Sequence, residues 1–170
     1  AKETMAWLQA TGSLEPLITL TQKLNRELID LLSTNNAVIN ADEAHVMARV
    51  RVGQLYLMSR NIENAEKMIL EAFALEPNNN EVLVFQSAVY LLKDNVDAAI
   101  KSIDKVLEQT PEFSSAVVMR ASIYAKTGDI KQAIELLKQG VLNAPDNEAM
   151  HIILTQLYAK QNLTDDVEKE

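Results

Sequence analysis

The side chains of this sequence that could do chemistry begin with two histidines, His45 and His151. Neither has a His, Asp or Glu four residues further along, the helical spacing at which two side chains can share one metal ion. The chain has no cysteine, so thiolate metal sites, disulfides and cysteine nucleophiles are excluded. We therefore interpret both histidines as structural residues and expect no metal site.

Carboxylates are the second possible source of chemistry. They recur on segments that would form outer helices, as in Glu63, Glu66 and Glu71. Paired carboxylates act as acid and base only inside a cleft, whereas this spacing is typical of a solvated helix face. The sequence also has no glycine-rich phosphate loop and no nucleophile elbow. It therefore predicts a protein with no catalytic residues, no cofactor and no enzymatic activity.

Composition narrows the classes of partner. Of the 170 residues, 48% are hydrophobic and 24% are charged, and the net charge of -8 would repel a phosphate backbone. The Lys and Arg residues form no basic patch, so nucleic-acid binding is not expected. No apolar run approaches the roughly 20 residues that a membrane helix needs. With only four Gly and four Pro, the sequence favours helices joined by short turns.

These helices are organised by a repeat. Four residue classes recur every 34 positions: Tyr56, Tyr90, Tyr124 and Tyr158; Pro77, Pro111 and Pro145; Ala65, Ala99 and Ala133; and Ile69, Ile103 and Leu137. A period of this length indicates helical hairpins that stack on one another. The Ala positions would let two helices approach closely, each Tyr would be largely buried, and each Pro would end a second helix. Turns within the hairpins are expected at 59–61, 93–95 and 127–129.

This pattern resembles the tetratricopeptide repeat family, in which large apolar, small, Tyr, Ala and Pro positions follow in the same order. The full repeats are 46–79, 80–113 and 114–147, and a partial fourth occupies 148–170. The resemblance implies an all-α, right-handed α-solenoid with a concave inner surface. Four residues depart from the family pattern. Arg49 and His151 stand at large apolar positions, and Gln86 and Arg120 stand at Leu positions.

Residues 1–45 do not follow the period and predict a non-repeat helical segment. An apolar stripe at helical spacing comprises Leu14, Leu17, Leu24, Leu28 and Leu31. We expect a helix over 14–32 that Ser13 caps and Asn35-Asn36 closes. It would cap the first repeat; alternatively, it would mediate dimerisation or lie in the concave groove. A short helix upstream is indicated by three apolar residues, Met5, Trp7 and Leu8.

The C-terminal segment predicts an incomplete hairpin. The first helix of the fourth repeat is expected to end near Lys160, and its partner would begin near Thr164 and be cut short at Glu170. The chain also opens at Ala1 without an initiator Met. We therefore expect it to be a piece of a longer protein in which the array continues.

The concave surface is the predicted working face. In the family it is lined by the second, fifth, ninth, twelfth and thirteenth positions of each first helix. The partner-binding residues that the resemblance implies here are Met47, Val50, Gln54, Leu57, Met58, Glu81, Val84, Ala88, Leu91, Leu92, Val118, Ser122 and Lys126. Chaperone-binding relatives place Lys, Arg and Asn at the inner positions, where this sequence has Val, so a clamp for peptide carboxylates is not expected. Met and Leu favour an apolar helix or extended peptide, with a mildly basic end at Lys126 and Lys160.

The sequence therefore predicts a non-enzymatic scaffold or adaptor that binds a protein or peptide partner in the concave groove. Two alternatives remain open. The chain could be a positioning or regulatory module of a larger protein, such as a transferase or a secretion-apparatus component, or it could be a self-assembly module that forms homodimers or larger oligomers. Analogy with other compact arrays favours the bacterial periplasm or envelope over the cytoplasm.

Overall fold

The computed structural model describes residues 15–42 and 45–167, and the regular structure in these residues is helical throughout. The helices are α2 (Glu15–Ala41), α3 (Val46–Met58), α4 (Ile62–Leu75), α5 (Asn80–Leu92), α6 (Val96–Gln109), α7 (Ser114–Thr127), α8 (Ile130–Asn143) and α9 (Glu148–Val167). The short helix predicted around Met5, Trp7 and Leu8 and the Ser13 cap lie outside the described residues.

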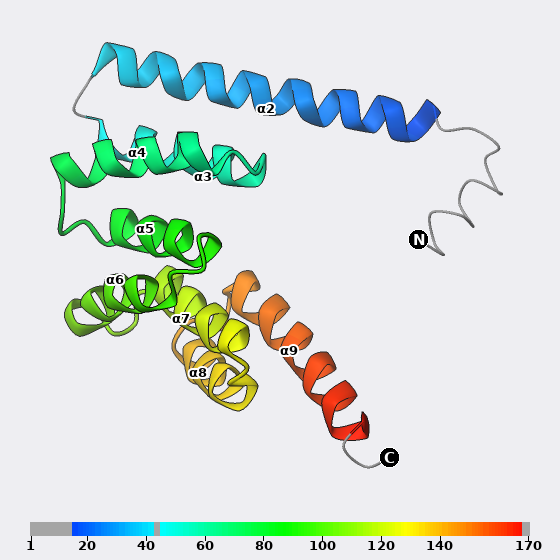
Figure 1. The fold of residues 1–170 in the computed structure, drawn as a ribbon. Coiled ribbons are helices and arrows are strands. Elements are labelled where there is room, and N and C mark those ends of the chain that lie inside the picture. The colour runs from blue at the N-terminus through cyan, green and yellow to red at the C-terminus, as the bar shows by residue number, and fades with distance from the viewer. Residues whose placement is uncertain (1–14, 43–44, 168–170) are drawn as a thin grey trace.

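Three helical hairpins form the middle of the molecule: α3 with α4, α5 with α6, and α7 with α8 (Figure 1). Each first helix also packs against the second helix of the hairpin before it, and consecutive first helices α3, α5 and α7 contact one another. At the two ends, α2 packs on α3 and α9 packs on α8 and α7. The arrangement is an α-solenoid, which confirms the predicted fold class.

The turns inside the hairpins share one feature of backbone conformation. Their middle residues adopt positive φ, 58° at Arg60, 58° at Asp94 and 91° at Gly128. The next residue is Asn61 or Asn95 in the first two hairpins, and its side chain accepts the backbone N–H three residues later. These turns lie where the sequence predicted them, because Asn and Asp favour the position before a helix.

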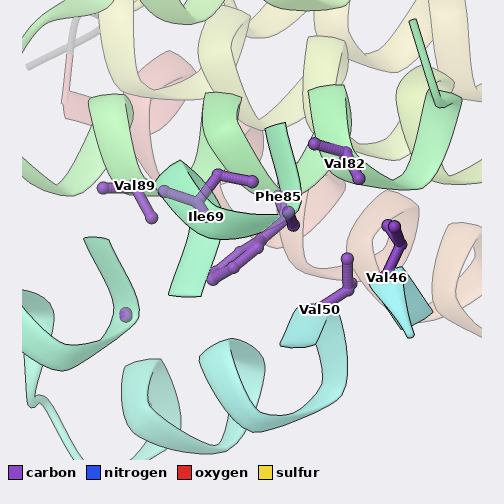
Figure 2. Close-up of a cluster of buried hydrophobic side chains, with 8 residues drawn as sticks. Val46, Val50, Ile69, Val82, Phe85 and Val89 are labelled. Atoms are coloured by element: carbon purple, nitrogen blue, oxygen red, sulfur yellow. The ribbon is translucent and has the colours of Figure 1, made fainter. Parts of the chain in front are cut away.

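Within the part of the chain that the structure describes, the core consists of three clusters, and each cluster joins one hairpin to the first helix of the next. In the first, Phe85 reaches from α5 toward α3 and packs with Ile69 of α4 and Val50 of α3 (Figure 2). Because each cluster draws on three helices, no hairpin is a self-contained unit. The repeated alanines Ala65, Ala99 and Ala133 are all 0% exposed, as their small size predicted.

Two details of the repeat differ from expectation. Tyr56, Tyr90 and Tyr124 are only partly buried, because they pack against the edges of the clusters. The second helices each end two residues before the Pro. Glu76 has φ -137° and ψ 79°, outside the helical region, which a following proline such as Pro77 disfavours.

Both terminal helices are longer than predicted. α2 continues through Asn35-Asn36 to Ala41, and α9 continues past Lys160 to Val167. The predicted closure at Asn35-Asn36 is wrong because Asn35 donates its side-chain amide to the Leu31 carbonyl at 2.8 Å, within the helix. The predicted break before Thr164 is also wrong.

The same sequence difference accounts for both long helices. In α2 and α9, the positions equivalent to the inner capping residues Asn61 and Asn95 are occupied by Glu27 and Leu163. Leu cannot cap a helix, and Glu is a poorer cap than Asn. The first two hairpins have a capping Asn at this position, and the third has Gly128 at a φ of 91° just before it. α2 and α9 have neither feature there, and the backbone continues as one helix.

Candidate partner-binding face

The inner faces of the first helices meet in a hollow of about 260 Å³ between α5, α7 and the start of α9. Its walls include Val84, Ser115, Val118, Met119 and Ala149. Val84 and Val118 are the fifth residues of their first helices, and Ser115 and Ala149 are the second residues. Equivalent positions of neighbouring repeats therefore line one continuous depression, and the lining is largely apolar.

The predicted face residues differ widely in exposure. Met58 is 79% exposed and Leu92 is 52% exposed, so both present apolar surface to a partner. Gln54 is also exposed. A further group is partly buried and contributes part of each side chain to the surface: Met47, Leu57, Glu81, Ala88, Leu91, Val118 and Ser122. The structure thus leaves most of the predicted set accessible.

Two members of the predicted set belong to the core. Val50 is 1% exposed and lies in the cluster that joins the first hairpin to α5. Val84 is 9% exposed, lies in the second cluster and also lines the hollow. The expectation that both side chains are free on the concave surface is wrong, because in α3 and α5 the fifth residue packs into a cluster that includes the adjacent first helix.

The basic end of the face is neutralised. Lys126 Nζ lies 2.5 Å from the Asp94 carboxylate and donates to the Leu91 carbonyl at 2.7 Å. Lys126 therefore links α7 to the turn that follows α5, and its charge is not free to attract an acidic ligand. The prediction of a mildly basic groove end is wrong for this residue, since a partner would have to compete with Asp94.

The polar departures from the family pattern are paired inside the array. Gln86 Oε1 accepts the Ser102 hydroxyl at 3.0 Å. Arg120 Nη1 lies 3.0 Å from the Asp104 carboxylate, and its guanidinium stacks 4.9 Å from the Tyr124 ring centroid. Sequence inspection missed the Gln86–Ser102 and Arg120–Asp104 pairs because each joins two different helices.

Arg49 is a buried cation with similar partners. It is 8% exposed, its Nε donates to Glu71 at 3.2 Å, and its Nη1 donates to the His45 carbonyl at 3.4 Å. The aliphatic part of an Arg side chain can fill an apolar position while its charged end is paired. The Arg49–Glu71 pair therefore substitutes for the large apolar residue that the family prefers.

Both histidines have structural partners. His45 Nδ1 accepts the Ala48 backbone N–H at 3.1 Å and so caps α3. His151 Nε2 lies 2.8 Å from the Pro145 carbonyl. On outer helix α8, hydrogen bonds from Gln139 and Lys138 lower the pKa of the exposed Glu135. Within the described residues, no group of three or more His, Asp or Glu side chains could hold a metal ion.

The length and hydropathy of the helices bear on membrane insertion. Among the residues from 15 to 42 and from 45 to 167, no helix has both the length and the apolar character needed to cross a bilayer.

Two family models match the chain by sequence. The model described as tetratricopeptide repeat matches residues 90–165. A second, described as tetratricopeptide repeat protein 21 ARM repeat, matches residues 1–127, which is well over half of the chain. The second match includes the segment 1–45 that lacks the repeat signature. A comparison with curated proteins gave no match.

Solved structures share the fold at low sequence identity. A thermophilic tetratricopeptide repeat protein of Thermus thermophilus superposes with a TM-score of 0.68 at 15% identity, over 89% of this chain and 85% of that chain. MamA gives 0.58 at 16% identity, over 88% and 87%. PilF of Pseudomonas aeruginosa gives 0.63 at 12% identity, over 86% and 67%.

Proposed function

We propose that this chain, which belongs to the tetratricopeptide repeat family, binds an apolar helix or extended peptide of a partner protein along the inner face of α3, α5, α7 and α9. The family is in general a non-enzymatic protein-interaction module. The observation that carries the proposal is the hollow between α5, α7 and α9, where Ser115, Val118 and Ala149 from successive repeats line one depression.

The chemistry of the exposed side chains indicates the class of ligand. Met58 and Leu92 are large, apolar and mostly exposed, and Met in particular adapts its shape to an irregular ligand. Lys126 is already paired with Asp94, so the face offers few unpaired cations to a carboxylate-rich peptide. An apolar ligand that covers Met58, Leu92 and the hollow therefore fits better than an acidic one.

Selection from a displayed library of random peptides tests this assignment. Peptides that bind the parent chain should be enriched in Leu, Ile, Met and aromatic residues, because those side chains fill an apolar depression. The key variant is Ser115→Glu, which places a charge at the rim of the hollow. Gln132→Glu is the matched control, since Gln132 is also exposed and also lies in the first turn of a helix, on α8.

The two variants should behave differently. Acidic residues in a first turn are tolerated or stabilising, so circular dichroism should report folded protein in both cases. We expect Ser115→Glu to weaken the selected peptides roughly tenfold, a change of about 1.4 kcal/mol in binding, and Gln132→Glu to leave them unaffected. Equal affinity for both variants would place the binding surface elsewhere on the array.

A further inference from the structure

A groove of about 380 Å³ lies between α4 and α6, over α5, which packs against both helices. Its lining comes from all three helices and includes Phe73 of α4, Tyr90 of α5 and Lys101 of α6. The hollow described above uses Val84 of α5, whereas the groove uses Gln86 and Tyr90, which project from the opposite side of that helix. The groove is therefore a second surface, separate from the proposed partner-binding face.

Two lysines of α6 form one wall of this groove. Lys101 is exposed, and Lys105, one helical turn later, is partly buried. Lys105 Nζ donates to the Pro77 carbonyl at 3.3 Å and to Asn78 Oδ1 at 2.7 Å, and both acceptors are neutral. Among the residues that the structure describes, no ion pair includes either lysine. Two like charges at this spacing repel each other, so the wall favours an anion between them.

The acidic residues around the groove are either paired already or outside its lining. Glu66 and Glu71 of α4 and Asp104 of α6 each form an ion pair with a side chain that is not a lysine of this wall. Asp97 and Glu108, near the two ends of α6, are exposed and do not line the groove. The lysine wall is therefore open to a carboxylate that another molecule supplies.

The repeat shows that this wall distinguishes α6 from the other second helices. The equivalent positions there carry one cation or none: Lys67 and Glu71 in α4, and Glu135 and Gln139 in α8. In the groove between α2 and α4, Glu71 is paired with the buried Arg49. One period later, Lys105 replaces the carboxylate and Leu83 replaces the arginine. The groove between α4 and α6 thus has cations in its wall and no carboxylate.

We propose that the groove between α4 and α6 is a second docking site, which binds an acidic segment of a partner protein. An Asp or Glu side chain of that segment would pair with Lys101 and Lys105, and a neighbouring apolar or aromatic side chain would cover Phe73 and Tyr90. A nucleic acid fits less well, because the net charge of -8 repels a long phosphate backbone. A short acidic segment meets only the local positive charge.

Fluorescence anisotropy with two labelled peptide mixtures tests the chemistry of the site. One mixture has the pattern X-X-Glu-Phe-Glu-X-X, where X is any uncharged residue, and the other has Gln in place of each Glu. The parent chain should bind the acidic mixture at least about tenfold more tightly, because only this mixture can pair with the lysine wall. Equal binding of the two mixtures, or binding of neither, would contradict the proposal.

Charge-matched variants test the location of the site. Lys101→Gln with Lys105→Gln should weaken binding of the acidic mixture roughly tenfold. The matched control is Lys67→Gln with Lys131→Gln, which removes the same charge from exposed lysines outside the groove lining and should have little effect. A similar loss in both double variants would indicate a general attraction between charges and would overturn the site.

Circular dichroism verifies that each variant is folded, because Lys105 also holds the segment after α4 through Asn78. If that double variant unfolds, Lys101→Gln alone decides. The Lys101 side chain is exposed and makes no hydrogen bond or ion pair with the described residues, so this substitution should leave the fold intact and still weaken binding several-fold. Unchanged binding by a folded Lys101→Gln chain would overturn the proposal.

Two further measurements separate this site from other assignments. A single-stranded oligonucleotide that displaces the acidic mixture as effectively as unlabelled acidic peptide would assign the groove to nucleic acid instead. Ser115→Glu, the variant that tests the hollow, should leave binding of the acidic mixture unchanged. A loss of binding in that variant would place the acidic peptides in the hollow and would also contradict the proposal.

Discussion

The inner hairpins and the terminal helices share one 34-residue register but differ at the turn. Between α3 and α4 the chain has Arg60 at a φ of 58° and Asn61 as a cap, and it folds back. At the equivalent place in α2 it has Arg26 and Glu27, and it continues as one helix. Because Arg occupies the middle position in both, the capping residue is what distinguishes the first hairpin from α2. The third hairpin turns at Gly128 instead, since Asp129 makes no capping hydrogen bond.

Equivalent repeat residues differ in exposure between the inner hairpins and the terminal helices because of this difference at the turn. The small residues of the inner first helices are enclosed by the second helix, and Ser87 and Ala121 are 0% exposed. In α9 the equivalent Thr155 is exposed and Tyr158 is 42% exposed, and in α2 the equivalent of Ala65 is the exposed Leu31. The comparison teaches that the face of a first helix toward its own second helix becomes core only where the hairpin closes, whereas the face toward the preceding repeat is buried even in α9, as Met150 and Leu157 show.

The largest expected effect on stability comes from introducing Glu at the repeated Ala position. The same substitution is compared in an inner hairpin and in α2. Ala99→Glu would bury an unpaired carboxylate between α5 and α6 and should lower the free energy of unfolding by roughly 3–5 kcal/mol. Leu31→Glu, two periods earlier, should leave stability nearly unchanged because that side chain is 52% exposed. Thermal melts of the monomeric chains compare them, and equal losses would mean that α2 is also enclosed.

Substitution of two glycines by alanine tests how closely the helices pack in the hairpins. A Cβ at Gly53 would lie 2.1 Å from Cζ of Phe85, which is buried in the first cluster. Gly53→Ala should therefore destabilise the chain, because overpacking costs about 1–3 kcal/mol. This cost should exceed the roughly 1 kcal/mol by which alanine is favoured over glycine inside a helix. At Gly140 the nearest atom is Sδ of the flexible Met150 at 2.9 Å, so Gly140→Ala should cost less. Urea denaturation measures both, and a reversed order would contradict the packing at Phe85.

The capping residues give a smaller contrast. Asn95 accepts the Ala98 backbone N–H at 3.2 Å, and Asn95→Ala should cost about 1 kcal/mol. Glu27→Ala, at the equivalent position of α2, should change stability by a few tenths of a kcal/mol because no helix begins there. Chemical denaturation resolves a difference of this size, and a comparable loss at Glu27 would indicate a turn in α2.

Substitutions of the middle turn residue should have effects of opposite sign in the two regions. Arg60 has a φ of 58°, which glycine adopts without strain, so Arg60→Gly should stabilise the chain by about 0.5 kcal/mol. Arg26→Gly should destabilise α2 by roughly 1 kcal/mol, because glycine is a poor residue inside a helix. Helix content by circular dichroism and denaturation midpoints provide the readout. A gain in stability from both substitutions would disagree with the helical conformation of Arg26.

The sequence predicted the hairpins because their signals are local and repeated. Ala99, the turn at 93–95 and Pro111 each constrain the backbone next to them, and the period adds their effects. The ends were harder to predict because there the signal is the absence of a cap, at Glu27 and Leu163. Asn35 illustrates the error, since an amide that commonly ends helices here bonds back to the Leu31 carbonyl.

The binding face was predictable only in part, for a tertiary reason. Its position follows from the register of the first helices, but the exposure of each residue depends on the neighbouring helix. Val50 is buried because the next first helix packs against it, while Met58, eight residues later, is 79% exposed. The ion pair of Lys126 with Asp94 joins residues from two repeats. It could not be predicted from the spacing of residues in the sequence.

The distance between two spin labels on α2 tests most directly that one register produces a hairpin inside the array and a continuous helix at its end. Cysteines introduced at Leu20 and Asn40 are compared with cysteines at Gln54 and Ala74, one period later, in a chain diluted with unlabelled protein. A continuous α2 separates the first pair by about 30 Å, whereas the α3–α4 hairpin holds the second pair at roughly 15 Å. A first distance as short as the second would show that α2 folds back and would contradict the account.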